Sequence, residues 1–154
     1  MSKRLPPTTP ETTRQPQTSV RVLIVDDFEP WRSWLRSVLT AYDHLCVAGE
    51  VADGLEAVHR AQALQPELIL LDIGLPSLNG IAAARQISKC APVSKILFLS
   101  AQRSAEIVRE AMLTGAAGYV RKADAGKDLL PAIKAVLRGE QFISDSLDGP
   151  ESRE

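Results

Sequence analysis

Five polar residues stand at or just beyond the carboxyl ends of apolar runs, where side chains of these types could act together. They are Asp26, Asp27, Asp72, Ser100 and Lys122. Carboxylates brought together repel one another unless a proton or a cation compensates their charge. A set of oxygen ligands favours a hard cation such as Mg²⁺, and a carboxylate can also accept a phosphoryl group. A hydroxyl and an ammonium nearby would neutralise charge on the phosphoryl oxygens.

The apolar runs before these residues predict the strands of a buried parallel sheet. Their bounds are residues 20–25, 45–51, 67–71, 95–99 and 117–120. A continuous apolar run is typical of a strand that is covered on both faces. Asp26 and Asp27 follow the first run, and Asp72 follows the third.

Between the runs, apolar residues recur at the spacing of helices. The pattern predicts helices over residues 31–39, 55–64, 81–88, 107–112 and 129–137. Asp27 is a candidate cap of the first helix, and Pro131 is expected to delay or kink the last one. Trp31 and Trp34 lie at helical spacing in the first helix, where we expect them to pack rather than to bind a ligand.

These alternating elements predict an α/β fold, a doubly wound parallel sheet of five strands with five helices. For units of this size we expect the flavodoxin-like strand order 2-1-3-4-5. Ligands of open α/β sheets bind beyond the carboxyl ends of the strands, where the strand order reverses. In this order the reversal lies between strands 1 and 3, so Asp26 and Asp27 would face Asp72.

Composition divides the 154 residues into one domain and two tails. Residues 1–19 are rich in proline, threonine and glutamine and are expected to form a disordered arm. Residues 145–154 are expected to be a flexible tail or the start of a linker, which leaves 20–144 as the domain. The net charge of −1 argues against nucleic-acid binding by this chain. Cys46 and Cys90 are too few for a disulfide framework and are expected to be buried thiols.

Four motifs resemble those of the response-regulator receiver family. They are Val25-Asp26-Asp27, Leu71-Asp72-Ile73-Gly74-Leu75-Pro76 with Gly80, Ser100-Ala101, and Gly118-Tyr119-Val120-Arg121-Lys122. The resemblance covers residues 20–144, and segments 129–133 and 139–144 are similar to the end of receivers from LuxR-type transcription factors. It implies a two-component signalling domain that accepts a phosphoryl group on Asp72 from a histidine kinase. The domain would then switch conformation to regulate an output such as transcription.

The resemblance also implies a metal site and a partner for the phosphoryl group. Asp27 and Asp72 would bind Mg²⁺ directly, and Asp26 would act through a metal-bound water. The main-chain carbonyl of Gly74 would be a further ligand. Lys122 would pair with the phosphoryl group on Asp72. Pro76 and Gly80 would shape the backbone beside the acceptor.

Ser100 and Tyr119 resemble the switch pair of the family. The hydroxyl would move toward the phosphoryl group, and the aromatic ring would turn inward behind it. Such a switch is a shift between two packings that new contacts bias toward one of them. The chain would catalyse its own phosphorylation and slow hydrolysis, without being an enzyme that turns over a substrate.

The expected partner is a histidine kinase, and whether the chain forms a homodimer stays open. DNA would be reached only through an output domain, since no helix-turn-helix pattern follows residue 144. No apolar run approaches the ~20 residues of a membrane span, and residues 1–19 lack the apolar stretch of a signal peptide. We therefore expect a cytoplasmic protein without a membrane partner.

Other interpretations stay open at this point. Asp26 and Asp27 could simply cap a helix, and Tyr119 could be a partly exposed strand residue. A haloacid-dehalogenase-like phosphohydrolase also uses an aspartate nucleophile with Mg²⁺, but needs a second aspartate two positions later, where Phe28 follows Asp26. A degenerate receiver would bind partners without phosphorylation, against which the intact acidic set argues.

Overall fold

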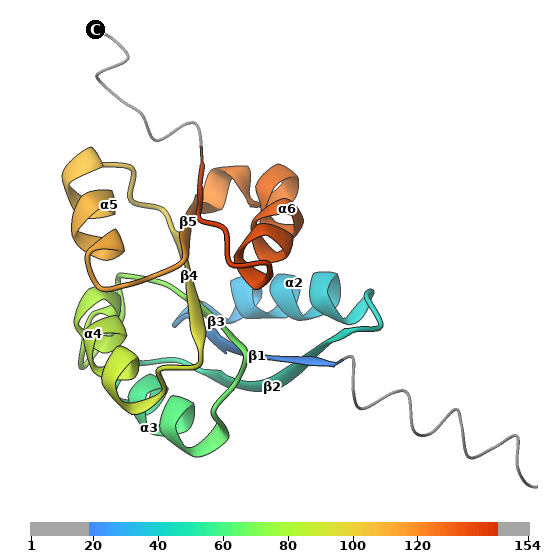
Figure 1. The fold of residues 1–154 in the computed structure, drawn as a ribbon, viewed down its shortest axis with the longest axis horizontal. Coiled ribbons are helices and arrows are strands. Elements are labelled where there is room, and N and C mark those ends of the chain that lie inside the picture. The colour runs from blue at the N-terminus through green and yellow to red at the C-terminus, as the bar shows by residue number, and fades with distance from the viewer. Residues whose placement is uncertain (1–18, 145–154) are drawn as a thin grey trace, which may run out of the picture.

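A parallel sheet of six strands forms the centre of the fold. The computed structural model describes residues 19–144, and all structural statements concern these residues. The strands are β1 (Val20–Val25), β2 (Leu45–Val51), β3 (Leu68–Leu71), β4 (Lys95–Ser100), β5 (Gly118–Arg121) and β6 (Phe142–Ile143). Their order is β2-β1-β3-β4-β5-β6, with every neighbouring pair parallel (Figure 1). The predicted order 2-1-3-4-5 is confirmed. The predicted arm (apart from Ser19) and tail lie outside the described residues.

The sixth strand goes beyond the prediction of five strands. Two residues carry no readable periodicity, so β6 had no signal in the sequence. The backbone N–H of Ser144 donates to the Tyr119 carbonyl at 3.0 Å. The buried Ser144 hydroxyl accepts the Arg121 N–H and donates to Asp128, both at 3.2 Å. These bonds fix the segment after the last helix against β5.

Helices cover both faces of the sheet, as predicted. They are α2 (Glu29–Thr40), α3 (Gly54–Leu64), α4 (Gly80–Cys90), α5 (Ala105–Met112) and α6 (Ala125–Leu137), with a short 3₁₀ turn η1 (Lys122–Asp124). Figure 1 shows α2 and α6 on one face and α3, α4 and α5 on the other. The side chains of Asp53, Asn79 and Ser104 cap α3, α4 and α5 by accepting backbone N–H groups in the first turn.

One expectation about helix ends is wrong, and a second is wrong in part. The N-cap of α2 is Phe28, which makes no side-chain cap bond, so Asp27 is not the cap. Pro131 does not delay the last helix, because α6 begins at Ala125 and continues through it. Pro131 is exposed on the solvent side of α6 and donates no backbone N–H to the helix, and the kink that the sequence also predicts there stays a prediction.

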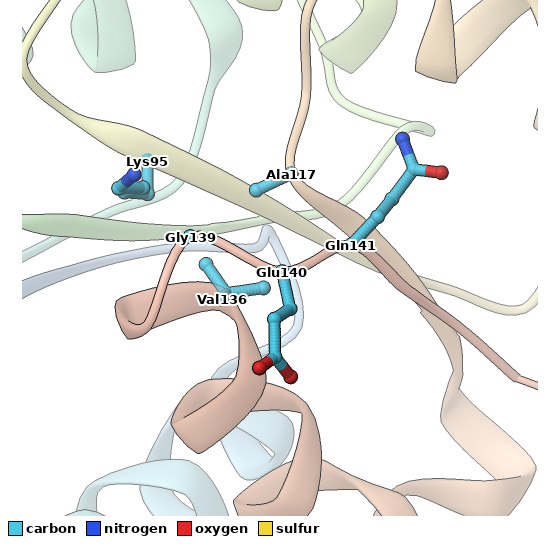
Figure 2. Close-up of a pocket in the computed structure, with 6 residues that line it drawn as sticks. All are labelled: Lys95, Ala117, Val136, Gly139, Glu140 and Gln141. Carbon is cyan, nitrogen blue, oxygen red and sulfur yellow. The ribbon is translucent and has the colours of Figure 1, made fainter.

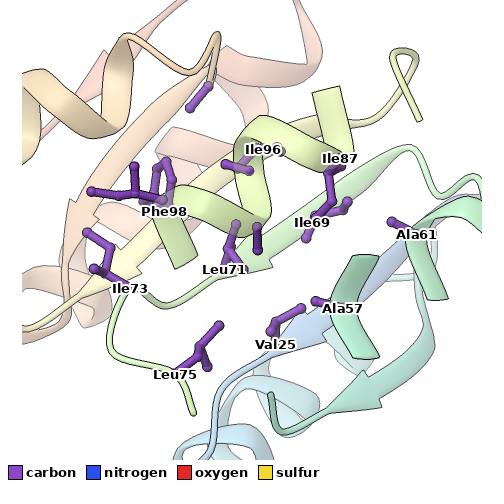
Figure 3. Packing of buried hydrophobic residues seen from close by; sticks show 14 of the residues in the cluster. Val25, Ala57, Ala61, Ile69, Leu71, Ile73, Leu75, Ile87, Ile96 and Phe98 are labelled. Carbon is purple, nitrogen blue, oxygen red and sulfur yellow. The ribbon is translucent and has the colours of Figure 1, made fainter. Parts of the chain in front are cut away.

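The two faces of the sheet carry separate apolar cores, as expected of strands covered on both sides. Every residue of β3 is buried, and successive residues serve opposite cores. Ile69 and Leu71 pack toward α3 and α4, together with Phe98 from β4 (Figure 3). Leu68 and Leu70 pack toward α2 and α6. Burial of each such side chain stabilises the fold by about 1.5–3 kcal/mol. The central strands are therefore firmly packed, and so are the residues at their carboxyl ends.

The cysteines do not match the expectation of buried thiols. Cys46 is exposed because it lies on β2, the outer strand, and Cys90 is partly buried at the end of α4. Among the described helices, none combines the length and apolar character needed to cross a bilayer.

Candidate functional site

Three carboxylates meet at the carboxyl edge of the sheet. Asp26 and Asp27 follow β1 and Asp72 follows β3, and these strands pair in register so that Val25 lies beside Leu71. One oxygen from each carboxylate lies within 4.8 Å of the others. Asp26 and Asp72 are buried, at 1% and 9% exposure, whereas Asp27 is exposed. The structure thus brings together the acidic set that the sequence predicts.

Backbone contacts fix the two buried carboxylates. The Asp72 N–H donates to the Val25 carbonyl at 3.1 Å, and Asp72 Oδ1 accepts the Ile73 N–H at 2.8 Å. Asp26 Oδ1 accepts the Phe28 N–H at 2.9 Å. This is a local turn contact and not a helix cap, because the N-cap residue is Phe28. The other oxygen of each carboxylate, Oδ2, faces the ammonium of Lys122.

Lys122 brings an ammonium to this cluster from the carboxyl end of β5. It lies in η1, directly after β5. Its Nζ is 2.7 Å from Asp26 Oδ2 and 3.5 Å from Asp72 Oδ2. The lysine side chain is mostly buried, with 22% exposure, so these ion pairs are only partly screened by solvent. Lys122 is therefore where the sequence predicts it.

One ammonium does not balance three carboxylates. Burial raises the pKa of Asp72 above its ordinary value, Lys122 opposes this, and the Asp26 charge adds to it. The cluster therefore holds excess negative charge on oxygen ligands. This donor set fits a hard divalent cation, which binds carboxylate oxygens and retains water ligands.

The switch pair comes from β4 and β5, with Ser100 as the last residue of β4 and Tyr119 as the second residue of β5, and both members contact Gln102. Ser100 is buried, and its Oγ accepts the Gln102 N–H at 3.1 Å. The Tyr119 hydroxyl donates to the Gln102 carbonyl at 2.8 Å. Tyr119 is fully buried beside Phe98, so the interpretation as a partly exposed strand residue is wrong. Burial also raises the pKa of Tyr119, which keeps the phenol protonated.

Glycine 80 lets α4 begin against the acceptor strand. A Cβ at this position would lie 1.9 Å from the Asp72 carbonyl oxygen, a distance that no side chain tolerates. The Gly80 N–H also donates to the Ile73 carbonyl at 2.7 Å. The predicted role in shaping the backbone beside Asp72 is confirmed for Gly80. At Gly74 a Cβ would meet nothing within 4 Å, and its carbonyl as a metal ligand stays a prediction.

Two pockets in the described part of the chain differ in their relation to this site. One, of about 290 Å³, borders it, because Ile73 and the predicted ligand Gly74 are part of its lining. The second, of about 150 Å³, lies at the other end of β4 and β5 (Figure 2). Its lining consists of Lys95, Ala117, Val136, Gly139, Glu140 and Gln141, which include none of the predicted site residues. Drug-sized ligands occupy roughly 300–1,000 Å³, so this pocket is too small for one. The carboxylate cluster is identified by its charges and distances instead.

Sequence reasoning missed two residues of the site. Gln102 acts through its backbone N–H and carbonyl, for which any residue type serves, so no sequence signal exists. For Trp31 the helical spacing predicts packing rather than ligand binding, yet its ring lies 5.1 Å from Lys122 Nζ. Its position four residues after Asp27, in the helix that leaves the acidic turn, is the signal that could have found it.

Comparison with known proteins agrees with this geometry. A family model described as the response regulator receiver domain matches residues 22–134. The transcriptional regulatory protein YxjL of Bacillus subtilis is 36% identical over 124 residues, which are 80% of this chain and 57% of YxjL. The response regulator protein VraR of Staphylococcus aureus is 35% identical over 125 residues, 81% of this chain and 60% of VraR. The chain thus spans less than two thirds of either relative.

A solved structure supports the same assignment. The crystal structure of a two-component response regulator of the LuxR family from Aurantimonas sp. SI85-9A1 superposes with a TM-score of 0.80 at 29% identity, covering 84% of this chain and 92% of that one. The family model covers most of the described domain, including Asp26 and Asp27, Asp72 and Lys122. The chain belongs to the response-regulator receiver family and is homologous to two-component regulators of the LuxR type.

Proposed function

We propose that this chain is a phospho-acceptor domain in which Asp72 receives a phosphoryl group from a histidine kinase or from a small phosphodonor. One observation carries the proposal: three carboxylates within 4.8 Å, with the Lys122 ammonium already placed on two of them. Asp26, Asp27 and Asp72 would hold Mg²⁺, with the Gly74 carbonyl as a further ligand. Bound there, the ion would neutralise charge on the phosphoryl oxygens.

The chain's own residues divide the transfer step between them. Asp72 Oδ1 is engaged by the Ile73 N–H, which leaves Oδ2 to attack phosphorus as the donor's leaving group departs with its electron pair. Lys122 lies on the Oδ2 side, where its ammonium would pair with a phosphoryl oxygen. The Ser100 hydroxyl, now an acceptor for Gln102, would become a donor to a second oxygen. In this proposal, positioning and charge neutralisation by these residues would speed the transfer of the phosphoryl group to Asp72.

The output follows from the contacts that this step changes. Ser100 and Tyr119 share Gln102, so a move of the Ser100 hydroxyl toward Asp72 alters the loop that Tyr119 holds. The surface formed by α5, β5 and α6 would change with it, and with it dimerisation or partner binding. Regulation of transcription through an output domain, and action in the cytoplasm, belong to the same proposal. We propose as well that this chain neither turns over a substrate nor binds DNA directly.

Intact-protein mass after incubation with acetyl phosphate tests the proposal. We expect one phosphoryl adduct on the wild type with Mg²⁺, and none with EDTA. Asp72→Asn should give no adduct, whereas Asp43→Asn, at an exposed aspartate outside the cluster, should behave as the wild type. An adduct that survives in Asp72→Asn would place the acceptor elsewhere. A wild type that neither acetyl phosphate nor a kinase can phosphorylate would contradict the proposal.

A further inference from the structure

Trp31 lies beside the ammonium of Lys122, at the side of the cluster that α2 covers. Its ring centroid is 5.1 Å from Lys122 Nζ, within the range of a cation–π contact. The residue comes from the first turn of α2, just beyond the Asp26–Asp27 turn. Lys122 therefore has three partners: two carboxylates and one aromatic face.

The aromatic face differs chemically from the carboxylates. It attracts a cation through its quadrupole, but it bears no charge, accepts no ordinary hydrogen bond and cannot bind Mg²⁺. A carboxylate that loses Lys122 can take another cation in its place, whereas the ring cannot. The ring is thus a contact of Lys122 for which Mg²⁺ at Asp26 and Asp72 would not compete.

Trp31 is half-buried, with the nitrogen of its indole inside the fold. The indole N–H is buried and has no hydrogen-bond partner among the described residues, although a buried tryptophan usually finds one. Trp31 packs at the edge of the apolar core beneath α2, and its ring also contacts Lys122 and Trp34, whose centroid is 5.0 Å away. Trp34 is more exposed, at 36%, and within residues 19–144 its ring makes no cation–π contact. The two tryptophans of the chain therefore differ in what they can do.

We propose that Trp31 is a positioning residue that holds the Lys122 ammonium at the cluster through a cation–π contact. The inference rests on the proposed function, in which Lys122 must pass from Asp26 to the phosphoryl oxygens. A lysine stem is flexible, and its ammonium is strongly hydrated. Without the ring contact, the Lys122 ammonium would therefore spend part of its time in solvent, away from the cluster. Trp31 keeps the ammonium near the cluster without competing for the metal or for the phosphoryl group.

Side-chain NMR of lysine tests the placement without any phosphorylation. A methylene next to an ammonium that sits over an indole face is shielded by the ring current. In the metal-free protein, with lysine labelled by ¹³C, the ε-methylene protons of Lys122 should resonate upfield of the other lysines. Lys122→Arg assigns the signal by its loss. The upfield shift should vanish in Trp31→Leu and persist in Tyr42→Leu, a control at an aromatic residue whose ring contacts His44.

Phosphorylation rates test the consequence. At saturating Mg²⁺ and fixed acetyl phosphate, Trp31→Leu should slow adduct formation about two- to five-fold, the size of one cation–π contact. Trp31→Phe, which keeps a weaker ring face, should recover part of the rate. In a Lys122→Met background, Trp31→Leu should cause no further loss, because the two residues act through one contact.

Each outcome decides between positioning and packing. A Lys122 signal without an upfield shift, or one that survives Trp31→Leu, would overturn the placement. An equal loss of rate in the wild-type and Lys122→Met backgrounds would show that Trp31 acts by packing alone. If the wild type formed no adduct at all, the NMR result would still stand, so failure of the proposed function is distinguishable from failure of this inference.

Discussion

The two halves of the site edge are built from different forces. At the ends of β1 and β3, charged groups meet: the carboxylates of Asp26 and Asp72 crowd together and share Lys122. On β4 and β5, neutral groups meet: Ser100 and Tyr119 are buried and hydrogen-bond to Gln102. The first half holds unbalanced charge, and the second is fully satisfied.

This difference predicts different responses to a cation. A site with surplus negative charge is destabilised until a cation enters, whereas neutral hydrogen bonds are indifferent to one. Changes in the acidic half should therefore depend on Mg²⁺, and changes in the switch half should not. The variants below test that division, from the largest expected effect to the smallest.

Gly80→Ala should lower the free energy of unfolding more than the other variants do, with or without Mg²⁺. The new Cβ would lie 1.9 Å from the Asp72 carbonyl oxygen, so α4 or the acceptor strand must move. We expect a loss of at least about 3 kcal/mol in the free energy of unfolding. Gly126→Ala is the matched control, because a Cβ there meets nothing in α6 and should stabilise by about 0.5 kcal/mol. Urea denaturation measures both; equal effects would refute the close approach.

Lys122→Met should be the most Mg²⁺-dependent variant. It leaves the carboxylates of Asp26 and Asp72 without their ammonium. In EDTA we expect a loss of about 2 kcal/mol, below the full cost of breaking a buried pair because the lysine is partly exposed. Mg²⁺ should recover part of it. Lys127→Met, at 72% exposure, should change little in either buffer. A Lys122→Met deficit that ignores Mg²⁺ would remove the charge argument.

Tyr119→Phe should show the opposite behaviour. The Gln102 carbonyl loses its donor while the buried ring and its contact with Phe98 stay. We expect a loss of about 1 kcal/mol, the same in EDTA and in Mg²⁺. Tyr42→Phe, at a ring that is 37% exposed, provides a control without an expected loss. If the cost at Tyr119 depended on Mg²⁺, the two halves would not be independent in the unphosphorylated protein.

The same division explains which parts of the site the sequence could predict. Asp26, Asp27 and Asp72 end strands whose apolar runs are readable, and parallel pairing must bring such ends together. Lys122 follows β5 by the same logic. Both layers of helices follow from the alternation of elements. The strand order does not follow from periodicity alone and is predicted as the expected arrangement of five units of this size.

The rest depends on three-dimensional details that residue types do not encode. Gln102 contributes only backbone groups, and β6 is too short for a pattern. The contact of Trp31 with Lys122 joins two segments far apart in the chain and depends on both rotamers. The misassigned cap at Asp27 has a similar cause, because capping depends on where the helix starts and Phe28 takes that place.

Thermal unfolding of the wild type and Asp72→Asn, first in EDTA and then with added Mg²⁺, tests the central claim most directly. Since burial and Asp26 raise the pKa of Asp72, the fold favours a neutral group there. In EDTA, Asp72→Asn should therefore melt above the wild type. Mg²⁺ should raise the wild-type midpoint, by about 2.7 kcal/mol of stabilisation at a hundred times its dissociation constant, and the variant far less. A wild type that ignores Mg²⁺, or an Asp72→Asn that melts lower in EDTA, would contradict a charged, cation-dependent acceptor site.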